Sequence, residues 1–109
     1  MKMKRRTTPT LKISIPDLDI ANVRSIDFIF KETHSETAPA IIKKTYPKEV
    51  TYDEAEEVFL MPFKEKETLL FTKSFAYMDT RILLNNDKIP PTEIAKVDMM
   101  STLFGDADV

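Results

Sequence analysis

The sequence predicts an all-β protein, an antiparallel sandwich of six to seven strands with one short helical turn. Segments in which apolar and polar residues alternate, the period of a half-buried strand, recur at intervals of roughly 10–15 residues along the chain. No segment combines the length and the apolar spacing of a long helix. The 109 residues fit a single domain with one hydrophobic core.

The first two predicted strands have the clearest patterns. Residues 10–15 alternate strictly between apolar and polar types and end at Pro16. Residues 24–32 form the strongest predicted strand, because they are rich in aromatic and β-branched side chains. The side chains expected to face the core from this strand are Ile26, Phe28 and Phe30.

A polar loop and a further strand come next. Residues 33–39 are typical of a loop, and residues 40–46 form a strand with Ile42 expected to point inward. Together with residues 24–32 they predict a hairpin with a long loop. The chain has one glycine, so its turns are expected to use Asn, Asp and Pro.

Residues 53–61 allow two interpretations. Asp53 and Glu56 have the spacing of a helix start, which would give a helix running to Met61. Alternatively, residues 57–63 form a strand, with Phe59 and Met61 on one face. We favour the strand, because the neighbouring segments are strands.

The second half of the chain continues the β pattern. Residues 64–71 predict a charged turn and one short helical turn that crosses an end of the domain, and residues 74–84 predict a long strand. The expected core-facing set of this strand is Ala76, Met78, Thr80 and Ile82, and the opposite set is Phe75, Tyr77, Asp79 and Arg81. Residues 85–88 form a turn before the final strand, residues 92–100, whose predicted inner face holds Ala95, Val97 and Met99.

Charge divides the chain into three parts. Residues 1–9 are expected to be a flexible basic arm, residues 10–100 the sandwich domain, and residues 101–109 an acidic C-terminal tail. Four of the 16 basic residues lie in the first six positions, so the remainder carries 12 basic against 18 acidic residues. The arm and the tail have opposite charge and could pair between neighbouring subunits, although each end taken alone is expected to fray.

The residue types needed for most catalytic or metal sites are missing. The chain has no cysteine, and its one histidine, His34, lies in a polar loop where we interpret it as solvated. Its one glycine rules out a glycine-rich phosphate loop. Carboxylate pairs occur in charged surface runs, where burial would not shift their pKa values. We therefore predict no enzyme activity, no cofactor and no metal, and no catalytic residue is assigned.

Nucleic acid and membranes are not expected partners. The acidic body opposes phosphate binding, and the strand aromatics alternate as core residues do, not as a stacking platform. No apolar run approaches the length of a membrane span, and no apolar stretch follows the basic start as in a signal peptide. We expect synthesis in the cytoplasm without a signal.

The candidate binding residues are Tyr77, Asp79 and Arg81. They share the face of one strand opposite the expected core face, and tyrosine and arginine are the types that anchor protein interfaces. The alternative is structural: Tyr77 covers a second core layer, and Arg81 pairs with a neighbouring carboxylate.

A series of short motifs spans nearly the whole chain. It comprises Thr7-Thr8-Pro9-Thr10, Lys43-Lys44-Thr45-Tyr46, Glu67-Thr68-Leu69-Leu70-Phe71, Ala76-Tyr77, Arg81-Ile82-Leu83 and Ile94-Ala95-Lys96-Val97. With this series the chain resembles short proteins encoded among the tail and baseplate genes of phages and prophages of Gram-positive bacteria. It is similar to the N-terminal β-sandwich of baseplate upper proteins.

This resemblance implies an immunoglobulin-like sandwich with a structural or assembly role in the virion, and we expect contacts with other tail or baseplate proteins. A homo-oligomer is a second candidate form of assembly. The glycine usual in the last hairpin is replaced by Asn85-Asn86-Asp87-Lys88, and Pro90-Pro91 precede the last strand, so we expect a wider hairpin. The competing hypothesis is a prophage-encoded module that binds or inhibits a host protein without catalysis.

Overall fold

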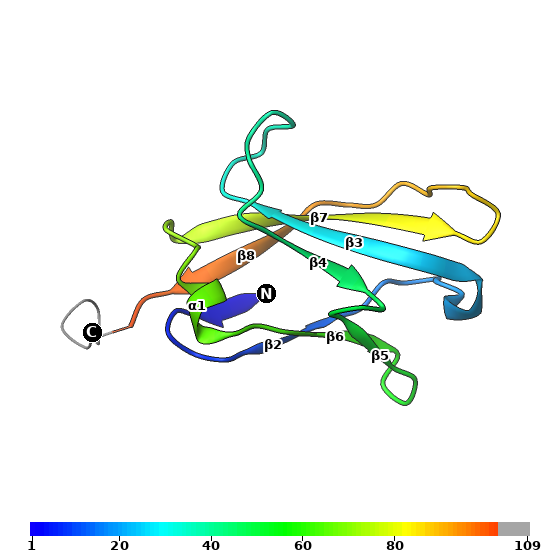
Figure 1. Ribbon diagram of the computed structural model, residues 1–109, viewed down its shortest axis with the longest axis horizontal. Coiled ribbons are helices and arrows are strands. Elements are labelled where there is room, and N and C mark those ends of the chain that lie inside the picture. The colour runs from blue at the N-terminus through cyan, green and yellow to red at the C-terminus, as the bar shows by residue number, and fades with distance from the viewer. Residues whose placement is uncertain (103–109) are drawn as a thin grey trace.

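Two β-sheets packed face to face form the protein (Figure 1). The computed structural model describes residues 1–102, and the predicted acidic tail lies mostly outside the described residues. Within residues 1–102 the strands are β1 (Lys2–Lys4), β2 (Thr10–Ile13), β3 (Val23–Lys31), β4 (Ile42–Tyr46), β5 (Thr51–Asp53), β6 (Val58–Pro62), β7 (Phe75–Leu84) and β8 (Ala95–Met100). The helical elements are the 3₁₀ turn η1 (Ile20–Asn22) and the helix α1 (Glu65–Thr68).

The strand order is that of an immunoglobulin-like sandwich. One sheet has the order β1-β8-β7-β3-β4 and the other β2-β6-β5. In the lettering of immunoglobulin domains, β2-β6-β5 correspond to B-E-D and β8-β7-β3-β4 to G-F-C-C′. The predicted all-β, immunoglobulin-like fold is confirmed, with eight strands among the described residues instead of six to seven.

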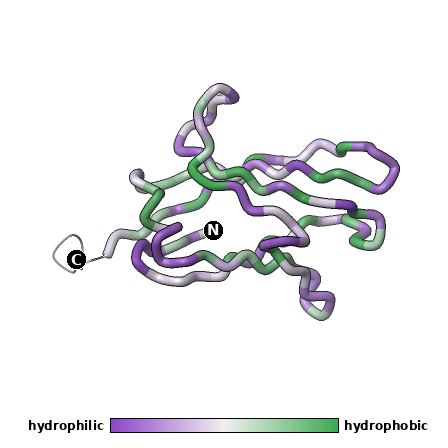
Figure 2. The backbone as a smooth tube through the Cα atoms, in the orientation of Figure 1, coloured by the Kyte–Doolittle hydropathy of each residue, from purple (hydrophilic) through white to green (hydrophobic). Residues whose placement is uncertain are grey.

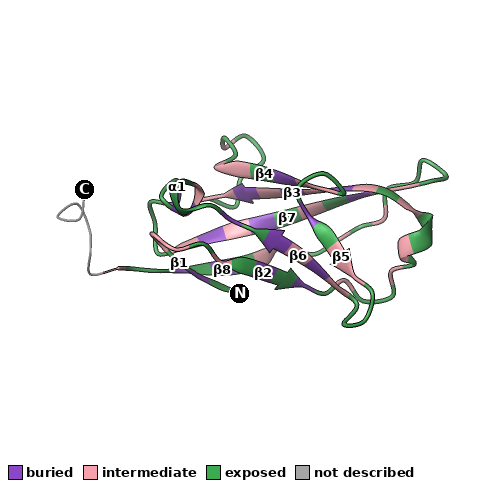
Figure 3. Cartoon of the chain, turned by 60° about the horizontal axis from the view of Figure 1, so that its bottom comes forward, coloured by how far each residue is buried: buried purple, intermediate pink, exposed green. Residues whose placement is uncertain are grey.

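Buried apolar residues from both sheets form one core cluster. Figures 2 and 3 show apolar and buried positions along the strands of both sheets. Ile26, Phe28 and Phe30 are fully buried, as their alternation predicts. Phe59 on β6 contacts aromatic rings of both sheets, with its ring centroid 6.1 Å from that of Phe28, 5.2 Å from that of Tyr46 and 4.8 Å from that of Tyr52. The chain has no cysteine, so no disulfide joins the two sheets.

The uncertain segment at residues 53–61 is a hairpin, so the helix interpretation is wrong. Asp53 accepts hydrogen bonds from the backbone N–H groups of Ala55 and Glu56, at 3.0 and 3.3 Å, and this closes a turn instead of capping a helix. Val58–Pro62 then pairs with both β2 and β5. The pattern did not predict β5, because three residues are too few for alternation to show.

The basic arm is ordered through residue 6, so the prediction of a flexible arm over residues 1–9 is wrong for these residues. Lys2–Lys4 pairs in parallel with Asp98–Met100, and Met3 is 2% exposed. The Arg5 guanidinium donates to the carbonyl of Phe71 at 2.6 Å and to that of Lys73. The burial of Met3 and the hydrogen bonds of Arg5 thus stabilise β1 against the fraying expected of a charged terminus.

Replacing Arg5 with alanine is expected to release β1 from β8. The loss of two hydrogen bonds from a charged donor should cost about 2–3 kcal/mol of unfolding free energy. Limited trypsin digestion measures the release, because Lys2, Lys4 and Arg6 are cleavage sites within or beside β1. The wild-type protein should resist cleavage there, and the Arg81→Ala variant, altered on the outer sheet face, should resist equally. Rapid cleavage of the wild-type protein at Lys4 would refute an ordered β1.

A buried ion pair joins β4 of the five-stranded sheet to the helix α1. The Lys44 ammonium on β4 donates to both carboxylate oxygens of Glu67 on α1 at 2.9 Å, with 6% of the lysine side chain and 19% of the glutamate side chain exposed. The same carboxylate accepts from the backbone N–H of Lys64 at 2.7 Å and closes the first turn of α1. Burial alone would raise the pKa of Glu67, but these hydrogen bonds and the Lys44 charge outweigh it and lower the pKa.

Candidate protein-binding face

Tyr77, Asp79 and Arg81 lie on the outer face of the five-stranded sheet. Their neighbours Ala76, Met78 and Ile82 on β7 are buried in the core, and alternation turns the three candidates away from it. Asp79 and Arg81 are exposed and Tyr77 is half-buried. The structure therefore places all three predicted residues on one solvent-facing surface.

Tyr77 stands at the centre of an aromatic and basic group. It is in register with Lys31 on β3 and with Lys96 on β8, so a lysine flanks it on each neighbouring strand. Its ring centroid is 5.2 Å from that of His34 and 5.6 Å from that of Phe75, both in edge contacts. The Lys96 ammonium lies 4.3 Å from the Phe75 ring centroid, a cation–π contact.

The charged candidates extend this surface along β7. Arg81 is in register with Asp27 on β3, which gives the arginine a carboxylate neighbour. The Asp27 carboxylate also accepts from the Thr45 hydroxyl at 3.0 Å. In the alternative, Tyr77 supports a second core layer, but the two rings that contact it are those of His34 and Phe75, and lysines flank it on both neighbouring strands.

A hollow of about 490 Å³ opens beside Tyr77. The loop after β3 forms one wall, and Tyr77 and Asp79 form the other. Its lining residues are Ile29, Lys31, Thr33, His34, Ser35, Glu36, Tyr77, Asp79 and Ile94. The Lys31 ammonium donates to the carbonyls of Ser35 and Glu36, at 3.1 and 3.0 Å, and holds the loop over the sheet. A hollow with an aromatic wall and a polar rim can accept a side chain from a partner protein.

No local pattern indicates that His34 belongs to this surface. The residue is exposed and lies in a loop, as expected, but its ring meets Tyr77, which is 43 positions further along the chain. The contact of His34 with Tyr77 follows from the register between β3 and β7. This register sets Lys31 opposite Tyr77 and so places the loop after β3 beside Tyr77. That register is a property of the folded sheet.

A second hollow, of about 820 Å³, opens where β2 and β8 approach the edge of the sandwich. Apolar side chains such as Ile13, Ile15 and Ala95 line it, and Pro90 and Pro91 border it. It belongs to the core side of both sheets, whereas the hollow at Tyr77 lies on an outer face.

Residues 1–102 contain neither a cluster of metal-ligand side chains nor a helix suited to a membrane. In this part of the chain no three His, Asp or Glu side chains come close enough together to hold a metal ion. Across the same residues, no helix has the length and apolar character needed to cross a membrane.

No family model and no curated protein matches the sequence. Among solved structures, the chain is similar to the extracellular domain of the voltage-gated sodium channel beta4 subunit, with a TM-score of 0.42 and 11% identity. The similarity covers 94% of this chain and 91% of that chain. That work describes parallel homodimers of the beta4 domain that explain its role in cell–cell adhesion. The fold assignment above rests on strand order and not on this likeness.

Proposed function

We propose that this protein is a structural or accessory component of a phage-type tail or baseplate and acts through protein–protein contacts without catalysis. The motif series supports the tail context, because it resembles the motifs of short tail-region proteins. The arrangement of Tyr77 supports the mode of action, since a half-buried tyrosine beside a hollow is a typical anchor point for a partner. The partners would be other tail or baseplate proteins, and the assembled location would be the virion.

Association with the products of neighbouring tail genes tests this proposal. The purified protein is mixed with each product, and complexes are detected by size-exclusion chromatography with light scattering. A complex with at least one tail product, together with the presence of the protein in purified particles, is expected. Absence from purified particles would contradict the structural role and favour a host-directed binding module.

The Tyr77→Ala variant should weaken the complex by about 30-fold or more, because truncating a central aromatic anchor typically costs at least about 2 kcal/mol of binding free energy. Isothermal titration calorimetry measures the change. Leu60→Ala is the matched control, since Leu60 is half-buried on the outer face of the opposite sheet and should bind normally. Equal affinity of the Tyr77→Ala variant would exclude the outer face of the five-stranded sheet as the contact.

A further inference from the structure

The two ends of the sandwich carry opposite charge. At one end, strand pairing and the Arg5 hydrogen bonds bring together residues 2–6, 64–73 and 98–102. These residues hold seven basic and three acidic side chains, a balance of +4. We call them the basic end; α1 marks it in Figure 1, and α1 and β1 are both labelled in Figure 3. Asp106 and Asp108 follow outside the described residues and are not counted.

The opposite end is acidic. It contains residues 12–24, 53–57 and 85–88, which hold seven acidic and three basic side chains, a balance of −4. Backbone and side-chain hydrogen bonds tie Asn85 to Asn22 and Ala21, and Arg24 reaches the Asn85 carbonyl at 2.9 Å. These contacts join the segments 12–24 and 85–88, and an ion pair of Lys12 with Glu56 ties residues 53–57 to segment 12–24. We call the three segments the acidic end.

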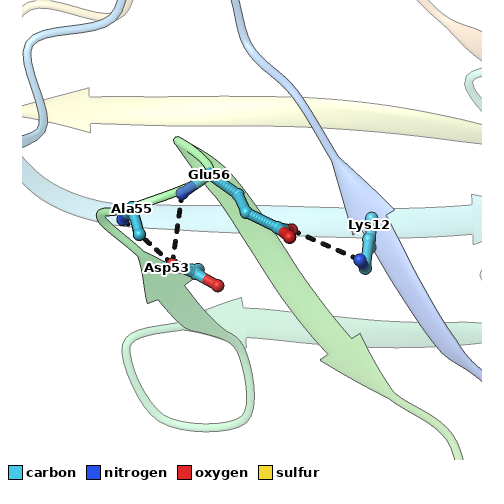
Figure 4. Close-up of polar contacts among 4 residues, drawn as sticks. All are labelled: Lys12, Asp53, Ala55 and Glu56. Carbon is cyan, nitrogen blue, oxygen red and sulfur yellow. Dashed lines mark hydrogen bonds and ion pairs between the residues drawn. The ribbon is translucent and has the colours of Figure 1, made fainter.

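The β5–β6 turn is the most strongly charged part of the acidic end, and Figure 4 shows the contacts that occupy two of its carboxylates. Asp53 is used in closing the turn, and Glu56 forms an exposed ion pair with Lys12 at 3.3 Å. Glu54 and Glu57 are exposed on the same turn. Two carboxylates can therefore face a partner without breaking the contacts that shape the hairpin.

The basic end also exposes apolar side chains among its charges, and one exposed apolar side chain borders the acidic end. At the basic end, Leu69, Leu70 and Met100 are 42%, 49% and 50% exposed. Ile89, directly after the acidic-end segment 85–88, is 47% exposed. An apolar centre within a charged rim is the usual anatomy of a protein interface, and opposite rim charges set its orientation.

We propose that copies of this chain associate end to end, with the basic end of one copy against the acidic end of the next. The two ends differ, so the contact is heterologous and leads to a ring or an open series of subunits, not to a closed two-fold dimer. The contact is separate from the outer face that carries Tyr77, so a subunit in the series keeps that face for another partner.

Sedimentation velocity of the full chain tests the proposal. At about 10 mM salt, where the Debye length is about 30 Å, species larger than a dimer are expected. Raising the salt to about 300 mM should lower the association constant by about tenfold or more, because both rims are solvent-exposed. A protein that is monomeric at both salt concentrations, or that stops at a dimer, overturns the proposal.

Two paired variants identify the surfaces. Lys4→Glu with Lys66→Glu brings the balance of the basic end to 0, and Glu54→Lys with Glu57→Lys does the same at the acidic end. Each variant alone should be monomeric. An equimolar mixture should form 1:1 dimers and nothing larger, because one intact basic end and one intact acidic end remain. The control, Lys43→Glu with Lys48→Glu, changes the same charge outside both ends and should assemble like the wild type.

A third variant tests the contribution of the apolar centre separately from that of the charges. Leu69→Ser with Leu70→Ser should also be monomeric while keeping the far-ultraviolet circular dichroism spectrum of the folded protein. Assembly that persists in the two charge variants would overturn the proposal. So would a mixture that stays monomeric. Tail-protein binding by the monomeric variants would still be expected, so failure here is distinguishable from failure of the tail role.

Discussion

The Phe59→Ala variant is expected to lose about 3–5 kcal/mol of unfolding free energy, a large part of the total stability of a domain of this size. Phe59 is 1% exposed and touches the rings of Phe28, Tyr46 and Tyr52, which come from both sheets. Removing its ring leaves a cavity at the contact between the sheets, and no disulfide holds them together. Urea denaturation followed by circular dichroism measures the loss.

Phe75→Ala is the matched control for this experiment. Phe75 is half-buried on the outer face of the five-stranded sheet, so its truncation opens no core cavity. It should cost about 1 kcal/mol or less. If both alanine variants are equally stable, Phe59 does not join the sheets.

Replacing Lys44 with methionine is expected to cost about 3 kcal/mol at neutral pH, because it leaves the Glu67 carboxylate largely buried without its cation. Chemical denaturation measures this loss. Lys44→Met combined with Glu67→Met should recover much of the stability, since breaking a buried pair costs more than replacing both partners by apolar groups. A double variant no more stable than Lys44→Met would show that the pair is not the reason for the loss.

The same ion pair predicts a pH dependence. Folding lowers the pKa of Glu67 from its ordinary value of 4.5, so the stabilisation it provides is complete above that value and is lost as the pH falls through the folded pKa. Stability should therefore decline below about pH 5. In the Glu67→Gln variant this decline should be shallower, and an unchanged slope would exclude Glu67 as a contributor.

Local patterns were sufficient to predict the long strands and the direction in which their side chains point. Alternation correctly separated Ile26, Phe28 and Phe30 from solvent, and it placed Tyr77, Asp79 and Arg81 together on the opposite face. A period of two residues fixes the face of every side chain once a segment is extended, so these assignments need no tertiary contact. A short helical turn within residues 64–71 was also predictable, because the charged residues that begin it are neighbours in the sequence.

Elements that depend on distant partners were missed or misread. The charges of residues 1–6 indicated a free arm. In the structure, Met3 is buried in the core, and Arg5 donates to two carbonyls more than 60 positions away. In the same way, β5 and the contact of His34 with Tyr77 exist only through pairing with other strands.

The sequence by itself therefore determined the β class, the inner and outer faces of the long strands and the absence of cysteine chemistry, because each follows from residue type and spacing. The pairing of β1 with β8, the hollow beside Tyr77 and the opposite charges of the two ends arise only in the folded protein. The physical reason is the same for all three: sheet register and loop packing bring together residues whose separation in sequence carries no information about their separation in space.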